Sequence, residues 1–110
     1  MKIVVLLKSA PSSVKAHRAL QVTADMLSQG HSMNLYLLQD AVRFCQPDLK
    51  NALSNEFNRL VDEKLKVSFL VQDAELRGID VKSVKQEISG GDFESLMDLM
   101  ESSDRVIGLL

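Results

Sequence analysis

The sequence contains a single cysteine, Cys45, and no tryptophan among its 110 residues. One cysteine excludes an internal disulfide, and a lone thiol is typical of a reducing cytoplasm, so we expect a cytoplasmic protein. Histidine is scarce as well. His17 and His31 lie at opposite ends of one expected helix, where they cannot easily share an ion. We therefore expect no metal site.

A surplus of positive charge and long apolar runs are also absent. The net charge of -2 argues against direct binding of nucleic acid, which normally requires a basic surface. No apolar run approaches the ~20 residues that a membrane span needs. The run Ile3–Leu7 is too short for the core of a signal peptide and predicts a first strand instead. We expect a small domain that contacts neither nucleic acid nor membrane.

Strand and helix patterns alternate along the chain, which has the length of one domain, residues 1–110. This alternation predicts an α/β fold with a mostly parallel sheet of about five strands and helices on both faces. The expected strands are Lys2–Leu7, Met33–Leu38, Lys66–Val71, Val84–Ile88 and Arg105–Leu110. The expected helices run from Ser12 or Ser13 to Gly30, from Gln39 to Cys45, onward from Pro47, from Gln72 to Gly78 and from Asp92 to Ser103.

The last expected helix is unusually apolar. Gly90 and Gly91 predict a turn that leads into it. The excess of apolar residues in "LMDLM" indicates a helix covered on two sides, either by the core or by a partner subunit. Helical spacing places four residues on one predicted buried face: Phe93, Leu96, Met97 and Met100.

Cys45 is a candidate catalytic residue because it follows the second expected strand by a few residues. A thiol becomes a nucleophile or a sulfur carrier only where it is exposed and its pKa is lowered. The alternative is that Cys45 packs as a small buried hydrophobe. Residue type favours burial, and both interpretations stay open.

The loop "KSAPSS" after the first strand is a candidate anion site formed by Ser12, Ser13 and His17. A loop that leads into a helix N-terminus presents free backbone N–H groups, which favour a small anion such as sulfite or phosphate. The loop has no glycine that would let the backbone wrap a pyrophosphate, so we expect no nucleotide cofactor. The alternatives are a helix cap for the serines and a solvated helix position for His17.

Asp40 and Asp73 each follow an expected strand, and each is preceded by glutamine. Paired carboxylates at one sheet edge could bind a cation or transfer protons. Each aspartate also begins a short helix, where a carboxylate caps free N–H groups. The sequence favours capping, because capping requires only local chemistry.

Three segments of the chain resemble the DsrE/DsrF/DsrH superfamily of sulfur-relay proteins. These segments are "LLQDAV", "VSFLVQDAELRGI" and "ISGGDFESLMDLMESSDRVIGLL". The C-terminal half, Leu65–Leu110, is closest in pattern to the DsrH (TusB-like) branch, whereas "LKSAPSS" and "QGH" look more like the DsrE branch. The resemblance spans nearly the whole chain and rests on core and turn residues.

The resemblance implies a Rossmann-like domain that assembles into homo-oligomers or into hetero-oligomers with other DsrE/F/H-like subunits. Active members carry sulfur as a cysteine persulfide, in sulfur oxidation or in transfer-RNA thiolation. In the DsrE branch the carrier cysteine lies at the tip of the third strand, a position that corresponds here to Leu70 or its neighbour. In the DsrH branch it lies in the first helix, and Val14–Gln29 contains no cysteine.

Three hypotheses about function follow. The first is an accessory subunit of intracellular sulfur relay that lacks the carrier cysteine, because Leu70 cannot hold sulfane sulfur. The second is a persulfide carrier or sulfurtransferase that acts through Cys45. The third is a small-anion-binding module built on Ser12, Ser13 and His17. We favour the first, followed by the second.

Overall fold

The computed structural model describes residues 1–49 and 52–110. Within these ranges the strands are β1 (Lys2–Leu7), β2 (Ser32–Leu37), β3 (Lys66–Leu70), β4 (Ile88–Gly91) and β5 (Arg105–Ile107). The α-helices are α1 (Val14–Ser28), α2 (Ala52–Asp62), α3 (Val71–Leu76) and α4 (Phe93–Ser102). Two 3₁₀ helices are η1 (Gln39–Cys45) and η2 (Val81–Ser83).

The strands form a 5-stranded sheet in the order β4-β3-β2-β1-β5. Every neighbouring pair is parallel, for example Val5 opposite Leu35 and Leu35 opposite Val67. The predicted α/β fold is confirmed, and the sheet is wholly parallel. Because parallel strands all end at one edge, the segments that follow β1, β2, β3 and β4 meet there.

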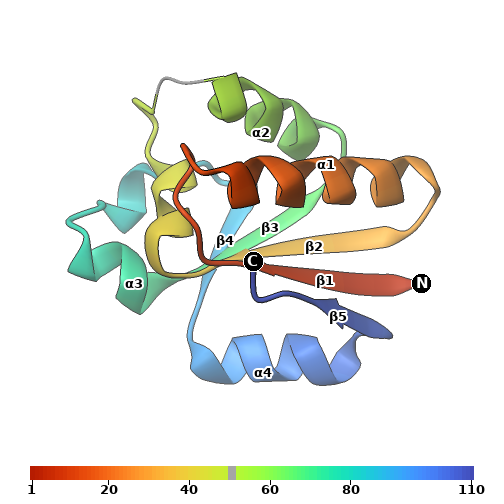
Figure 1. Ribbon diagram of the computed structural model, residues 1–110. Coiled ribbons are helices and arrows are strands. Elements are labelled where there is room, and N and C mark those ends of the chain that lie inside the picture. Colours follow the sequence, from red (N-terminus) through yellow and green to blue (C-terminus); the bar gives the residue numbers. More distant parts are fainter. Residues whose placement is uncertain (50–51) are drawn as a thin grey trace.

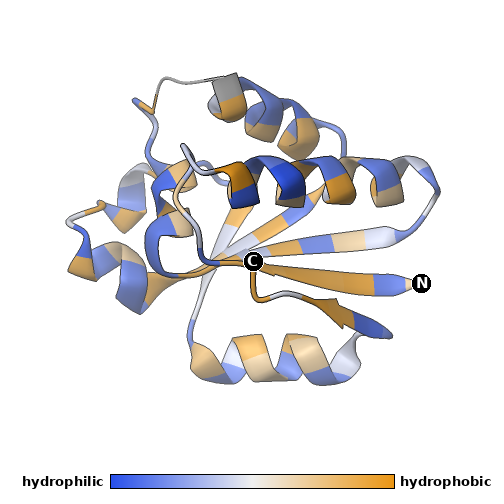
Figure 2. Ribbon diagram, in the orientation of Figure 1, coloured by the Kyte–Doolittle hydropathy of each residue, from blue (hydrophilic) through white to orange (hydrophobic). Residues whose placement is uncertain are grey.

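Helices cover both faces of the sheet, as predicted. Figure 1 shows α1 and α2 on one face and α4 on the other. Figure 2 shows β1 almost wholly apolar, whereas α1 and α2 mix apolar and polar residues. Successive side chains of β1 therefore enter different cores: Val5 and Leu7 pack in the large cluster under α1 and α2, and Val4 and Leu6 pack in a small cluster under α4.

Helix α1 begins and ends where the sequence predicts. The Ser13 Oγ accepts a hydrogen bond from the Ala16 N–H at 3.1 Å and so caps the helix N-terminus. Gly30 follows the helix with φ +93°, a left-handed conformation that glycine adopts without steric cost. The buried face consists of Ala16, Ala19, Leu20 and Thr23.

The predicted strand Val84–Ile88 and the predicted glycine turn are wrong. Strand β4 starts at Ile88, and Gly90 and Gly91 belong to it. These glycines are required by packing, since a Cβ on Gly90 would lie 2.8 Å from the Val71 Cγ2. The polar segment before Ile88 forms η2 and a turn, with its charged side chains in solvent.

Three other predicted boundaries shift. Pro47 and Asp48 form a turn and do not open a helix. The helix described by the structure, α2, starts at Ala52, and residues 50–51 of the predicted helix lie outside the described residues. The predicted strand Arg105–Leu110 is shorter, because β5 ends at Ile107 and Gly108 follows with φ +139°. The segment from Gln39 to Cys45 is helical as predicted, in the tighter 3₁₀ form.

The predicted buried face of α4 is wrong in part. Leu96 is buried in the small core, but Phe93 is 56% exposed and Met97 is 60% exposed. The residues that pack with Leu96 are Leu99 and Met100. The reason is that α4 packs on β1, β2 and the end of β3 through one side only, which leaves the apolar residues on its other side in solvent. No helix in the described ranges is both long and apolar enough to cross a membrane.

Candidate functional site

Two charged contacts join the segments that follow β2 and β3. The Asp73 Oδ2 accepts a hydrogen bond from the Gln39 backbone N–H at 2.7 Å. The Arg77 Nε donates to the Asp40 Oδ1 at 3.0 Å. The prediction that each aspartate caps the short helix on which it lies is therefore wrong. Neither side chain makes such a capping hydrogen bond. Both carboxylates hold the two segments together.

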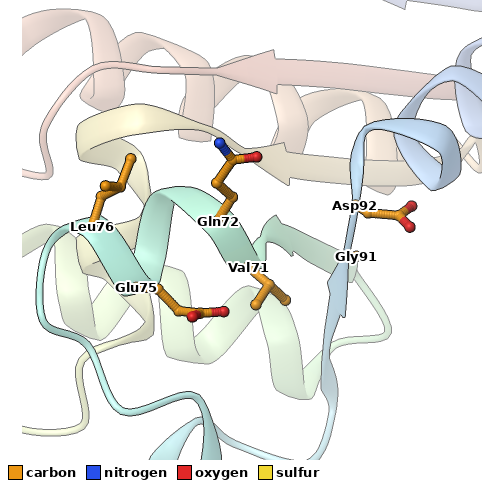
Figure 3. A pocket seen from close by; sticks show the side chains of 6 residues that line it. All are labelled: Val71, Gln72, Glu75, Leu76, Gly91 and Asp92. Atoms are coloured by element: carbon orange, nitrogen blue, oxygen red, sulfur yellow. The ribbon is translucent and has the colours of Figure 1, made fainter.

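A pocket of about 450 Å³ lies beside this junction, at the carboxyl ends of β3 and β4. Figure 3 shows Val71 and Glu75 on the same side of α3, across the gap from Gly91 at the end of β4. Gln72 and Leu76 add to the α3 side, and Asp92 adds to the β4 side. The walls are mostly apolar and the polar groups are an amide and two carboxylates. This arrangement is typical of a small-molecule site.

Tyr36 supports the β4 side of the pocket through its hydroxyl. Its hydroxyl donates a hydrogen bond to the Asp92 carbonyl oxygen at 3.3 Å and lies 3.4 Å from the Ser95 Oγ. The Asp92 Oδ1 accepts from the Ser95 N–H at 2.8 Å and caps α4. Burial raises the pKa of Tyr36, and the nearby Asp92 charge raises it further, against the lowering effect of the Ser95 hydrogen bond. The phenol therefore stays neutral and acts as a donor.

Leu70, at the position that the resemblance assigns to the carrier cysteine, is part of the core. It ends β3 directly before α3 and is 1% exposed. Its side chain packs in the small cluster with Val4, Leu6, Tyr36 and Leu96. The site presents an apolar, covered side chain where a sulfur carrier would need an exposed thiolate.

Cys45 is buried at the end of η1, with 4% of its surface exposed. Burial raises the pKa of the thiol from 9.0 to about 12. It borders a cavity of about 40 Å³ together with residues of the Pro47 turn, α2 and β4, and not the carboxyl-edge pocket. These conditions are the reverse of those that activate a thiol.

The three residues that were predicted to bind an anion, Ser12, Ser13 and His17, lie in different surroundings. Ser12 is exposed, and the Ser13 hydroxyl both accepts from the Ala16 N–H and donates to the Ala10 carbonyl at 2.7 Å. His17 is exposed and lines a groove of about 420 Å³ against Glu56 of α2. Ser13 therefore caps α1, and His17 faces α2.

The acidic residues, the histidines and the cysteine do not cluster in the described parts of the chain. Across residues 1–49 and 52–110, no group of three or more His, Cys, Asp or Glu side chains could hold an ion. The carboxylates of Asp40 and Asp73 are directed to Arg77 and to a backbone N–H.

A family comparison identifies the chain. The model of the DsrE/DsrF-like family matches residues 1–109. The chain belongs to the DsrE/DsrF-like family. The expected likeness of the C-terminal half to the DsrH branch stays a prediction, because the family match extends over both halves.

Solved structures show how widely this DsrE/DsrF-like fold is shared. The ychN protein from E. coli is 21% identical, with a TM-score of 0.88 and coverage of 97% of each chain. A protein of unknown function, MTH1491 from Methanobacterium thermoautotrophicum, is 8% identical, with a TM-score of 0.77 and coverage of 98% of this chain and 100% of that one. At these identities the likeness concerns the fold alone. No curated protein sequence matches the chain.

Sequence reasoning missed the pocket of this DsrE/DsrF-like protein. Val71, Gln72, Glu75 and Leu76 recur with one-turn spacing on α3, which was a usable signal for a shared helix face. Nothing local could show that Asp92, on another element, lies across from them. Tyr36 was likewise an ordinary strand residue until the fold placed its hydroxyl under α4.

Proposed function

We propose that this DsrE/DsrF-like protein is an accessory subunit of an intracellular sulfur relay and does not itself carry sulfur. The observation that carries the proposal is Leu70, an apolar residue 1% exposed at the position where the resemblance places the carrier cysteine. A persulfide needs a thiolate to hold its outer sulfur, and leucine offers no such atom.

The remaining thiol supports the same conclusion. With the pKa of Cys45 raised to about 12 by burial, roughly one thiol in 10⁵ is ionised at pH 7. Persulfide formation requires this thiolate to attack the terminal sulfane sulfur of a polysulfide and displace the shortened chain. A buried, protonated sulfur is poorly suited to that attack, so we place sulfur transfer on a partner.

The exposed apolar side chains of α4 support docking of such a partner. Phe93 and Met97 are one helical turn apart and more than half exposed. Exposed apolar patches mark interaction surfaces more often than scattered single residues do. We propose that another DsrE/F/H-like subunit, either a second copy or a cysteine-bearing homologue, covers this face in the cytoplasm.

The first test is the intact mass of the purified protein after incubation with a polysulfide donor, with a Cys45→Ser variant in parallel. We expect no added sulfur on either protein under native conditions. A stable gain of one sulfur atom that disappears in Cys45→Ser would overturn the accessory role and make Cys45 the carrier.

The second test is co-purification with a cysteine-bearing DsrE/F/H-like homologue from the same cell. We expect the complex to survive in wild type and in Val14→Asp, which changes an exposed apolar residue on α1. The double change of Phe93 and Met97 to Asp should dissociate it. Retention of the complex by that variant would remove α4 as the docking face, and absence of any such complex would remove the accessory role.

A further inference from the structure

The carboxyl-edge pocket, formed by Val71, Gln72, Glu75, Leu76, Gly91 and Asp92, has the size of a small-molecule site. Its volume of about 450 Å³ lies within the roughly 300–1,000 Å³ of typical ligand pockets. It also lies outside the carboxyl ends of parallel strands, where open α/β sheets bind their ligands. None of its residues takes part in the proposed docking of a relay partner through α4.

Part of the pocket wall is apolar. Gly91 packs closely behind the pocket, since a Cβ there would lie 2.9 Å from the Tyr36 Oη and would also strike the Ser95 Oγ. Val71 packs partly against the core, whereas Leu76 is 74% exposed and lies at the pocket rim. A ligand with an apolar body would cover this surface and remove it from water.

The lining of the pocket has no positive charge. Two of the lining residues, Glu75 and Asp92, are acidic, although the Asp92 carboxylate points away from α3 (Figure 3), and none is lysine, arginine or histidine. Asp92 is already used as the cap of α4. Within the described residues, the Glu75 carboxylate and the Gln72 amide have no hydrogen-bond or ion-pair partner, so both are available to a ligand.

We propose that this pocket binds a small organic cation. An apolar body lies against Val71 and reaches Leu76 at the rim, and an ammonium group pairs with the Glu75 carboxylate, which lies on the same side of α3 as Val71 (Figure 3). Small anions such as sulfite or phosphate are disfavoured, because the Glu75 carboxylate repels like charge and no lining residue is cationic. The proposal is independent of sulfur transfer, so it stands or falls separately from the accessory role.

The test is an NMR titration of the ¹⁵N-labelled protein with three probes of matched shape: 2-phenylethylamine, 2-phenylethanol and 3-phenylpropionate. We expect the amine to shift the backbone amides of α3, Gly91 and Asp92 in a saturable way. We expect about threefold weaker binding of the alcohol, since the ion pair is solvent-exposed, and still weaker binding of the carboxylate.

Two variants and a control assign the effect to the pocket. Glu75→Gln should abolish the preference for the amine over the alcohol. Leu76→Ala should weaken the binding of all three probes to the same extent. Glu87→Gln changes an exposed carboxylate outside the pocket and should change nothing. The proposal is overturned if the amine shifts no pocket amides, if the carboxylate binds as tightly as the amine, or if Glu75→Gln keeps the wild-type preference.

Discussion

The Asp73 carboxylate accepts the backbone N–H of Gln39 at 2.7 Å, across 34 positions of the chain. Gln39 has φ +48°, an uncommon conformation for a residue other than glycine. The hydrogen bond therefore holds a strained turn at the end of β2 by means of a side chain that follows β3. Arg77 and Asp40 make the reciprocal contact between the same two segments. Together the two contacts fix the sheet edge beside the pocket.

Replacement of Asp73 by alanine should destabilise the protein by about 1 kcal/mol. The substitution removes the carboxylate that accepts the hydrogen bond from the Gln39 N–H. The cost should be similar to that of losing a helix cap. Urea unfolding measures the effect. Glu87→Ala, at an exposed carboxylate outside the contacts described here, is the matched control and should stay within about 0.5 kcal/mol of wild type. Equal stability of the two variants would contradict the structural role of Asp73.

The ion pair of Arg77 with Asp40 should show measurable coupling. Arg77 is 21% exposed and Asp40 is 57% exposed, so solvent screens the pair in part. A double-mutant cycle with Arg77→Met and Asp40→Ala should give a coupling energy of about 0.5 kcal/mol. If the effects of the two single substitutions on the free energy of unfolding simply add in the double variant, the 3.0 Å contact contributes nothing to stability. The pair of Arg59 on α2 with Glu63 directly after the helix, with 50% and 53% exposure, is a comparison at greater solvent exposure and should couple less.

A methyl group at Gly91 should destabilise the protein because of the Ser95 and Tyr36 hydroxyls. An alanine Cβ would strike the Ser95 Oγ and lie 2.9 Å from the Tyr36 Oη, and overpacking of this kind costs about 1–3 kcal/mol. Adding Tyr36→Phe to Gly91→Ala should recover part of that loss, whereas Tyr36→Phe alone should be mildly destabilising. Thermal unfolding of the three variants tests this. If the losses of stability in Gly91→Ala and Tyr36→Phe simply add in the double variant, the two residues do not touch.

The Cys45 thiol should be almost inert in the folded protein. Burial raises its pKa to about 12, so alkylation by iodoacetamide at pH 7.5 should be far slower than in guanidinium-unfolded chain. The unfolded protein at the same reagent concentration is the control. Equal rates in the folded and unfolded states would show an accessible thiolate and would revive Cys45 as a sulfur carrier.

The same raised pKa predicts a loss of stability in alkali. The folded thiol keeps its proton while the unfolded thiol, with pKa near 9.0, releases it. This contribution is complete below pH 9 and declines as pH rises toward 12, by up to about 1.4 kcal/mol per pH unit. The free energy of unfolding should therefore fall more steeply in wild type than in Cys45→Ser, which retains Tyr36. Parallel slopes would contradict the raised pKa.

Local patterns predicted much of the fold. Continuous apolar runs located β1, β2 and β3, because strands buried on both faces need apolar residues throughout. Ser13 and Gly30 marked the ends of α1, because capping and left-handed turns depend on neighbours in sequence. Strand β4 was missed, because the need for glycine there comes from side chains of β3 and α3.

The sequence by itself determined the alternating α/β architecture, the single cysteine at position 45 and the apolar residues at the end of the third strand, since these follow from residue types and their spacing. Only the tertiary structure decided which carboxylates pair, where the pocket lies and that Cys45 is a buried, weakly acidic thiol. Those properties depend on contacts between distant segments and on exclusion of water, and neither is encoded in any short stretch of the chain.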